Sequence, residues 1–148
     1  MGFISENLIK DETVIHQGKL HKVIYMPAAA AGLWGLILIF GVPVLGTLLI
    51  LLAGYLAFQA WMRETTTEIA LTNKRLLGKT GFIKRDTIDL NLKKVESLYA
   101  DQDLLGRMWN YGSIRVVGTG GSSFIVKGID DPVAFKRAAS SEIDAAQA

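Results

Sequence analysis

The 148-residue sequence contains no cysteine, and this absence excludes several kinds of chemistry. A chain without thiols has no disulfide, no thiolate metal ligand and no cysteine nucleophile, and it suits a reducing cytoplasm. Histidine is almost as scarce, because His16 and His21 are the only two. Their five-residue spacing does not place them together on a helix face, so we interpret both as solvated residues. The sequence therefore predicts no metal site and no cofactor.

Charge is missing from one long stretch, because residues 23–62 contain no Asp, Glu, Lys or Arg. A straight helix of about 40 residues would be roughly 60 Å long, twice the ~30 Å hydrocarbon core of a membrane. Gly41, Val42 and Pro43 divide the stretch into residues 23–40 and 44–62, each about 27–29 Å long as a helix. These lengths predict a transmembrane helical hairpin. Acidic residues in the preceding segment, residues 1–22, argue against a cleaved signal peptide.

The charges beside the stretch predict its orientation in the membrane. Lys19 and Lys22 precede the first span and Arg63 follows the second, whereas the connecting turn is uncharged. By the positive-inside rule, the N-terminal segment and everything after the second span lie in the cytoplasm. Tyr25 and Trp61 then lie at the cytoplasmic ends of the spans, where amphipathic rings are favoured.

Residues 63–148 form the remaining domain, and their pattern predicts strands followed by a helix. Residues 87–92 alternate apolar and polar side chains, as in a strand with one buried face. The predicted strands are residues 65–72, 75–80, 87–92, 95–100, 114–117 and 124–126. Asp131 and Pro132 predict a helix start, because Asp caps free N–H groups and Pro fits the first turn. The whole pattern predicts an α+β fold, a small β-barrel or sandwich plugged by an amphipathic C-terminal helix that turns Phe135 inward.

Five short motifs in this domain resemble those of the bacterial pleckstrin-homology-like (PH-like) domains, often called membrane-flanked domains. In order, they are the turn Leu71-Thr72-Asn73-Lys74-Arg75, Gly81, the segment 92–95, Leu104-Leu105-Gly106-Arg107, and Tyr111-Gly112. Two preceding spans are also usual in that family. The resemblance implies a bacterial inner-membrane protein with two nearly orthogonal sheets capped by the C-terminal helix. It implies no activity, since most of the family is known only as a domain of unknown function.

The residues themselves also predict a non-enzymatic protein. Asp101 and Asp103 have no histidine or nucleophile near them in the sequence, so we interpret them as solvated loop residues. The glycine-rich segment 118–123 lacks the Gly-Lys-Ser/Thr ending of a phosphate-binding loop and leads into a strand, which is typical of a hairpin turn. The small net charge of +2 also argues against nucleic acid as a partner.

Two surface features are candidates for binding. Eukaryotic PH domains hold inositol phosphates with cations in their first turns, and the resemblance places Lys74, Arg75, Lys84 and Arg85 in comparable turns. These four are candidate contacts to anionic headgroups, each worth roughly 1 kcal/mol near an anionic leaflet, with ordinary solvated charge as the alternative. The second feature is the apolar segment 104–112, which we interpret as a loop. Its residues Leu105, Met108 and Trp109 either close one end of the barrel or form a contact patch or membrane-dipping edge.

The spans predict self-association, because small residues recur four apart, as at Ala31 and Gly35, and let helices approach closely. Packing between the two spans of one hairpin is the alternative explanation of these small residues. Trp34 lies deeper than an interfacial aromatic residue should, which suggests a contact within the hairpin or with a neighbouring subunit. A basic half, residues 74–94, and an acidic half, residues 95–148, favour a head-to-tail contact. We therefore expect a homo-oligomeric membrane scaffold among membrane lipids. The alternatives are an anionic-lipid or peptide-binding module, or an accessory subunit that binds another membrane protein.

Overall fold

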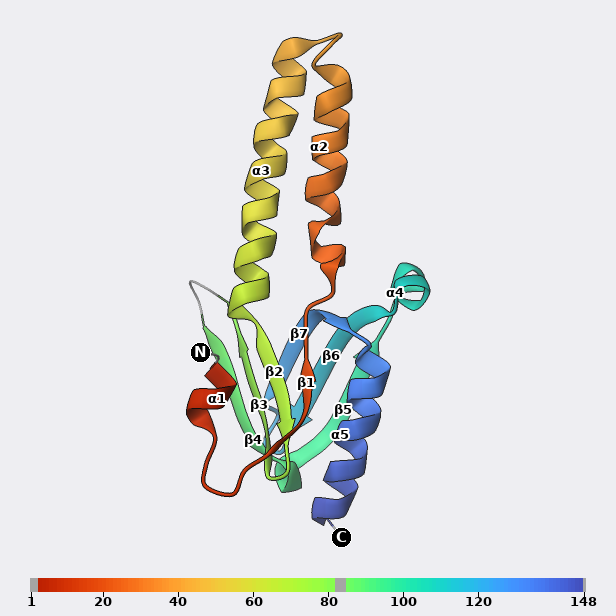
Figure 1. The fold of residues 1–148 in the computed structure, drawn as a ribbon. Helices are drawn as coiled ribbons and strands as arrows, with labels where there is room; N and C mark the ends of the chain where they lie inside the picture. Colours follow the sequence, from red (N-terminus) through yellow and green to blue (C-terminus); the bar gives the residue numbers. More distant parts are fainter. Residues whose placement is uncertain (1–2, 82–84, 148) are drawn as a thin grey trace. The chain divides into compact units, whose positions relative to one another are not determined.

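The computed structural model describes residues 3–81 and 85–147, which divide into two compact units (Figure 1). One unit contains Met1–His21 with Thr66–Ala148 and is β-rich, and the other, Lys22–Thr65, is helical. In chain order the elements are α1 (Phe3–Asn7), β1 (Val14–Gly18), the 3-10 helix η1 (Lys22–Tyr25), α2 (Met26–Leu38), α3 (Pro43–Thr66), β2 (Glu68–Thr72), β3 (Arg75–Thr80), β4 (Asp86–Asn91), the 3-10 helix η2 (Leu92–Lys94), β5 (Val95–Asp101), α4 (Leu104–Trp109), β6 (Tyr111–Gly118), β7 (Ser123–Asp130) and α5 (Pro132–Gln147).

The first sheet of the β-rich unit is antiparallel, in the order β1-β2-β3-β4. Its first strand comes from the N-terminal segment, where Gly18 pairs with Ile69 and Val14 pairs with Thr72 of β2. Sequence reasoning assigned no strand there, because β1 is short and Gly18 is its one buried residue. The helical unit thus lies in sequence between two strands that are hydrogen-bonded neighbours.

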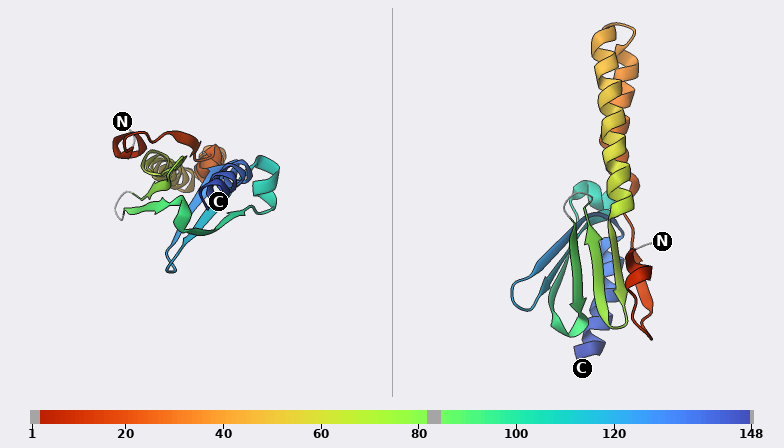
Figure 2. Two further views of the ribbon diagram at one scale, coloured as in Figure 1. Left: turned by 90° about the horizontal axis from the view of Figure 1, so that it is seen from below. Right: turned by 90° about the vertical axis from the view of Figure 1, so that its left-hand side faces the viewer.

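The second sheet is also antiparallel, in the order β5-β6-β7, and Figure 2 shows both sheets from two further directions. Gly120 and Gly121 both have positive φ angles in the turn between β6 and β7, which confirms the predicted hairpin turn. An isolated bridge between Leu20 and Ile129 joins the segment after β1 to β7. This bridge ties the two sheets together close to the residue at which the chain leaves the unit.

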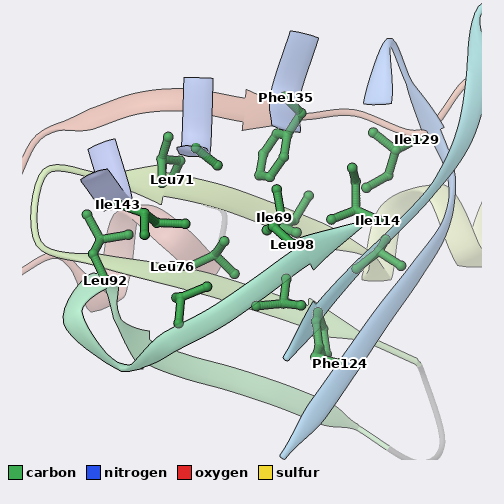
Figure 3. Packing of buried hydrophobic residues seen from close by; sticks show 14 residues of the cluster. Ile69, Leu71, Leu76, Leu92, Leu98, Ile114, Phe124, Ile129, Phe135 and Ile143 are labelled. Atoms are coloured by element: carbon green, nitrogen blue, oxygen red, sulfur yellow. The ribbon is translucent and has the colours of Figure 1, made fainter. Parts of the chain in front are cut away.

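The core lies between the two sheets and α5, as Figure 3 shows. Ile69 and Leu76 enter it from the first sheet, and Ile114 enters from the second. Phe135 of α5 is fully buried and meets the His16 ring edge-on at 5.5 Å. Helix α5 packs against β1, β5, β6 and η2. The predicted α+β architecture of two antiparallel sheets with a C-terminal helix is therefore confirmed.

The start of α5 follows from its first residues. The Asp131 carboxylate accepts a hydrogen bond from the Ala134 backbone N–H at 3.1 Å, and Pro132 is the first helical residue. This arrangement satisfies a free donor of the first turn and uses a residue that has no donor of its own. The predicted helix start is confirmed.

The helical unit is a hairpin of two apolar helices, α2 and α3, with a break over residues 39–42. The break overlaps the predicted one at Gly41, Val42 and Pro43, but Pro43 is the first residue of α3, and α2 is shorter than the predicted first segment, residues 23–40. Among the described residues, α3 is the one helix long and apolar enough to cross a membrane. The segment Lys22–Leu38, which joins η1 to α2, is a shorter apolar helix. Only 11% of the apolar window of α3 is buried, so this helix is not the core of a globular domain.

Candidate functional site

The candidate headgroup cations do not converge on one place. Lys74 lies in the turn between β2 and β3, where its ammonium donates a hydrogen bond to the Lys10 carbonyl at 3.0 Å. Arg85 lies just before β4 and is exposed. All of β3 separates these two residues, a length of about 17 Å for a strand of its size. Lys84 is outside the described residues. The described cations therefore do not build a joint headgroup pocket.

Arg75, the remaining candidate, is held inside an ion-pair network. Its Nε donates to the Glu12 carboxylate at 2.9 Å, and its Nη2 donates to the same carboxylate at 3.1 Å. Two further acceptors, the Asp89 carboxylate and the Asn7 carbonyl, occupy the rest of the guanidinium. The Arg75 side chain is only 13% exposed, so its charge is committed to the fold and not to a lipid headgroup.

Glu12 is the buried partner in this network, with no exposed side-chain surface. The Arg75 hydrogen bond is the main reason that the pKa of Glu12 falls from 4.5 to about 2, against the opposing effect of burial. The Ile9 backbone N–H and the Thr72 hydroxyl also donate to it, at 2.8 and 2.7 Å. The same pairing raises the pKa of Arg75. The network thus joins the N-terminal segment to the β2–β3 turn and holds both charges at neutral pH.

An open groove of about 640 Å³ lies between the start of β7 and the β4 side of the first sheet. Arg85 and Asp86 place opposite charges side by side in its lining, and Phe124 and Ile125 add apolar surface. Thr80, Thr87, Ser122 and Ser123 supply hydroxyl groups to the same groove. The mixed lining offers no concentrated charge for an anion, and it contains no histidine or cysteine.

The segment 104–112 was predicted as a loop, and the structure shows a short helix, α4, within it. The Asp103 carboxylate caps this helix by accepting a hydrogen bond from the Gly106 N–H at 2.6 Å. Asn110 ends it in a left-handed conformation, with φ of 56°. The amide of Gln102 donates to the carbonyls of Gly106 and Tyr111. Asp103, read from sequence as a solvated loop carboxylate, is therefore a helix cap.

The apolar side chains of α4 point away from the core. Leu104 is 80% exposed and Met108 is 74% exposed, while Leu105 and Trp109 are each a little under half exposed. The interpretation in which Leu105, Met108 and Trp109 close the end of a barrel is therefore wrong. The alternative, a contact patch or membrane-dipping edge, agrees with this exposure.

Small residues in the helical unit pack the two helices of one chain together. Gly35 is buried, and a Cβ there would lie 2.8 Å from the Ile50 side chain and 3.1 Å from the Gly46 carbonyl. A Cβ at Gly46 would lie 2.5 Å from the Ile39 nitrogen. Gly35 thus serves contact within the hairpin and is not a free surface for a second copy. Ala31, one turn earlier, stays half-buried.

Polar contacts join the two ends of the helical unit, and Trp34 points out of it. The Tyr25 hydroxyl donates to the Glu64 carboxylate at 2.5 Å, and the Lys22 ammonium lies 3.8 Å from the same carboxylate. Trp34 is 59% exposed, so contact within the hairpin does not bury its indole. Of the two explanations for Trp34, a contact inside the hairpin is therefore the weaker.

The two histidines belong to the β-rich unit. His16 contacts Phe135, and His21 stacks on Tyr111 with ring centroids 5.5 Å apart. Their interpretation as simply solvated residues is therefore wrong, because both rings pack on aromatic neighbours. In residues 3–81 and 85–147, no group of three His, Cys, Asp or Glu side chains is arranged to hold a metal ion.

Comparison with known proteins adds one finding. A family model described as Bacterial PH domain matches residues 23–143 of this chain. The matched range begins at the first residue of the charge-free stretch and ends within α5, so β1 precedes it. No curated protein and no solved structure matches the chain.

Proposed function

The chain belongs to the bacterial PH domain family, and from this premise we propose that it is a non-enzymatic integral membrane protein that holds its PH-like domain at the cytoplasmic face of the bacterial inner membrane. The observation that carries the proposal is the place of the helical hairpin, Lys22–Thr65, in the chain. It connects β1 to β2, which are paired strands of the domain. The PH-like domain is the β-rich unit described above.

The surface of the hairpin supports its placement in lipid. Large apolar side chains are exposed along both helices and their connection, namely Leu33, Leu36, Ile37, Phe40, Val44, Leu45, Leu48, Leu51, Leu52 and Phe58. Soluble monomers rarely expose a continuous apolar surface of this extent. Helix α3, with 24 residues, is about 36 Å long, enough for one crossing. The segment Lys22–Leu38, at about 17 residues, lies at the lower limit for a second crossing.

Two connections to the hairpin restrict how the domain can move. The chain leaves the domain at His21 and re-enters it at Thr66, and β2 begins two residues later at Glu68. A domain attached at two adjacent strands keeps one end near the membrane, whereas a single linker would let it rotate freely. We infer that the protein is a scaffold that presents its PH-like domain to the cytoplasm.

Cysteine labelling in intact cells tests the membrane topology, because the chain has no cysteine of its own. Gly41→Cys lies in the exposed turn between the helices, and we expect a membrane-impermeant maleimide added from outside to label it. The matched control, Glu96→Cys on exposed β5, should be labelled only after lysis. A fluorescent protein fused at the C-terminus should fluoresce, and a periplasmic phosphatase fused there should be inactive. Labelling of Glu96→Cys in intact cells would contradict the proposal.

Self-association is a second candidate function, and the outward position of Trp34 favours it. An indole N–H within lipid needs a hydrogen-bond acceptor, and a second hairpin can supply one. Ala31 lies one turn before Trp34 and Ile37 one turn after it, so these residues share a side of α2. The contact that we propose between copies therefore uses the Ala31–Trp34 side and not Gly35.

Cross-linking in native membranes tests this second candidate. Ile37 is 55% exposed and lies one turn from Trp34, so we expect Ile37→Cys to form a disulfide-linked dimer on oxidation. Adding Trp34→Leu to Ile37→Cys should reduce the amount of cross-linked dimer. Leu48→Cys on α3 provides a matched control on the other helix. A monomer at Ile37→Cys with normal expression would rule out association through this side.

A further inference from the structure

Helix α4 exposes an apolar surface that the fold does not use. Leu104 and Met108 are four residues apart and therefore share one side of the helix, and Leu105 and Trp109 form a second such pair. Burial of apolar surface contributes roughly 25 cal/mol of favourable free energy per Å², and this contribution is lost while these side chains stay in water. A six-residue helix also has little stability of its own.

Polar contacts and close backbone packing hold α4 in place instead. Asp103 caps its start, Asn110 ends it, and the Gln102 amide donates to the Gly106 carbonyl. Gly106 is the buried residue that faces the domain, and a Cβ there would lie 2.5 Å from the Tyr111 carbonyl. The domain thus fixes the helix through its glycine side, which leaves the apolar side chains directed outward.

Helix α4 lies at the end of the domain where the chain leaves for the hairpin and returns from it (Figure 1). His21, the last residue before the hairpin, stacks on Tyr111, which is two residues beyond the end of α4. The Asp130 N–H binds the Lys19 carbonyl, and the Asp131 N–H binds the Asn110 carbonyl. The contact between the His21 and Tyr111 rings therefore joins the residue at which the chain leaves the domain to the residues just after α4.

We propose that α4 is an interfacial anchor that inserts Leu104 and Met108 into the lipid leaflet from which the hairpin emerges. The inference rests on the membrane placement proposed above. Trp109 and the exposed Arg107 suit the headgroup region, where amphipathic rings and long cationic side chains are favoured. Four side chains offer too little area for a stable protein contact, which needs about 800 Å² per partner. The occupant of this surface is therefore lipid and not a second copy.

Depth-dependent quenching of a fluorophore tests the anchor in the full chain. The protein is reconstituted in vesicles of phosphatidylethanolamine and phosphatidylglycerol, with an environment-sensitive probe on Met108→Cys. We expect blue-shifted emission, a large loss of fluorescence with doxyl-labelled lipids and little loss with aqueous iodide. Ser122→Cys, in the exposed turn between β6 and β7, is the control and should show the opposite pattern. Leu48→Cys in the hairpin reports separately on membrane insertion.

Each other outcome overturns the inference in a distinguishable way. If Leu48→Cys is quenched by doxyl lipid but Met108→Cys is quenched by iodide, the hairpin is inserted and α4 stays in water. If Met108→Cys is protected from both quenchers and cross-links to a second copy, α4 is a protein contact. If Leu48→Cys is not quenched by doxyl lipid, the membrane placement itself fails, and the anchor fails with it.

Discussion

At the scale of single residues, the pair of Glu12 and Arg75 has the strongest effect on how the chain is held together. Glu12 precedes β1, so the pair attaches the N-terminal segment to the β2–β3 turn from outside the sheet ladder. Removal of one partner from a buried ion pair leaves the other charge without compensation, which costs about 3–5 kcal/mol. The stability of the first sheet therefore depends on a carboxylate that is not part of any strand.

Glu12→Gln should lower the free energy of unfolding by about 3 kcal/mol at neutral pH, because Arg75 loses its closest charge while the shape of the side chain is kept. Glu96→Gln, at an exposed carboxylate of β5, is the matched control and should change stability by less than about 0.5 kcal/mol. Urea unfolding of the full chain in detergent, followed by circular dichroism, measures both. Equal midpoints for the two variants would contradict the role of the pair.

The pH dependence of the same pair has a defined sign. The folded state lowers the pKa of Glu12 from 4.5 to about 2, so its contribution is complete above pH 4.5 and is lost as the pH falls toward 2. At 1.36 kcal/mol per pKa unit, the loss amounts to about 3 kcal/mol. The stability difference between the wild-type chain and Glu12→Gln should therefore be constant near neutral pH and narrow between pH 4.5 and pH 2. A difference that stays constant over this window would contradict the prediction.

At the scale of elements, α5 completes the core that the two sheets leave open, and Phe135 is its central contact. Phe135→Ala should lower the free energy of unfolding by about 3–5 kcal/mol, as buried aromatic truncations do. Val133→Ala, on the exposed part of the same helix, is the matched control and should have a small effect. Thermal unfolding of the full chain measures the difference. Similar melting temperatures for the two variants would mean that the Phe135 ring contributes little to the packing of the core.

The two apolar helices depend on glycine at one crossing point, where Gly46 meets the backbone of Ile39. Gly46→Ala should push α2 and α3 apart and cost roughly 1–3 kcal/mol, as overpacking does. Gly54→Ala in the same helix meets nothing within 4 Å and is the matched control. The loss of the helical circular dichroism signal on heating in detergent measures the thermal stability of both variants. Identical melting curves would show that the hairpin tolerates a wider crossing.

At the scale of the whole molecule, the helical hairpin is an insertion in the sequence of the β-rich domain. The domain consists of residues from before and after this insertion. Paired β1 and β2 hold the two ends of the insertion close together, with Gly18 opposite Ile69. The domain boundary predicted at residue 63 therefore leaves out β1 and Glu12. A fragment that starts there lacks an edge strand and the buried ion pair.

Replacement of Lys22–Thr65 by a short glycine-serine linker should give a folded, water-soluble domain, because β1 and β2 still pair and Glu12 still meets Arg75. The fragment 63–148 should be much less stable, since the edge of β2 and the Arg75 guanidinium lose their partners. Dispersion of amide resonances in NMR spectra compares the two proteins. A well-dispersed spectrum from the fragment alone would show that β1 is dispensable. The linker protein would then be no more stable than the fragment 63–148.

Local chemistry along the sequence was sufficient for many elements. The hydrogen bond between Asp131 and Ala134, the break before Pro43 and the strand Arg75–Thr80 follow from residues that lie next to one another, so sequence reasoning found them. The resemblance to the PH-like family was likewise carried by short motifs, and the family match confirms it. The absence of charge over residues 23–62 is a property of the sequence alone, and it predicts two membrane spans. The structure shows two apolar helices, α2 and α3, in this part of the chain, and their crossing of a membrane stays a prediction.

Only the tertiary structure decided which of these residues meet. The sequence predicts Arg75 to be a cation in a turn that is available to a headgroup. In the structure, Glu12 of the N-terminal segment forms a buried ion pair with it. The sequence allows Gly35 to contact either the other helix of its own hairpin or another subunit, and in the structure Gly46 and Ile50 of the same chain occupy its side. The strand Val14–Gly18 has almost no pattern of its own, because β2 supplies its partners. Sequence patterns report the local preference of a residue, whereas ion pairs, helix crossings and edge strands depend on partners far away in the chain, which the fold alone brings together.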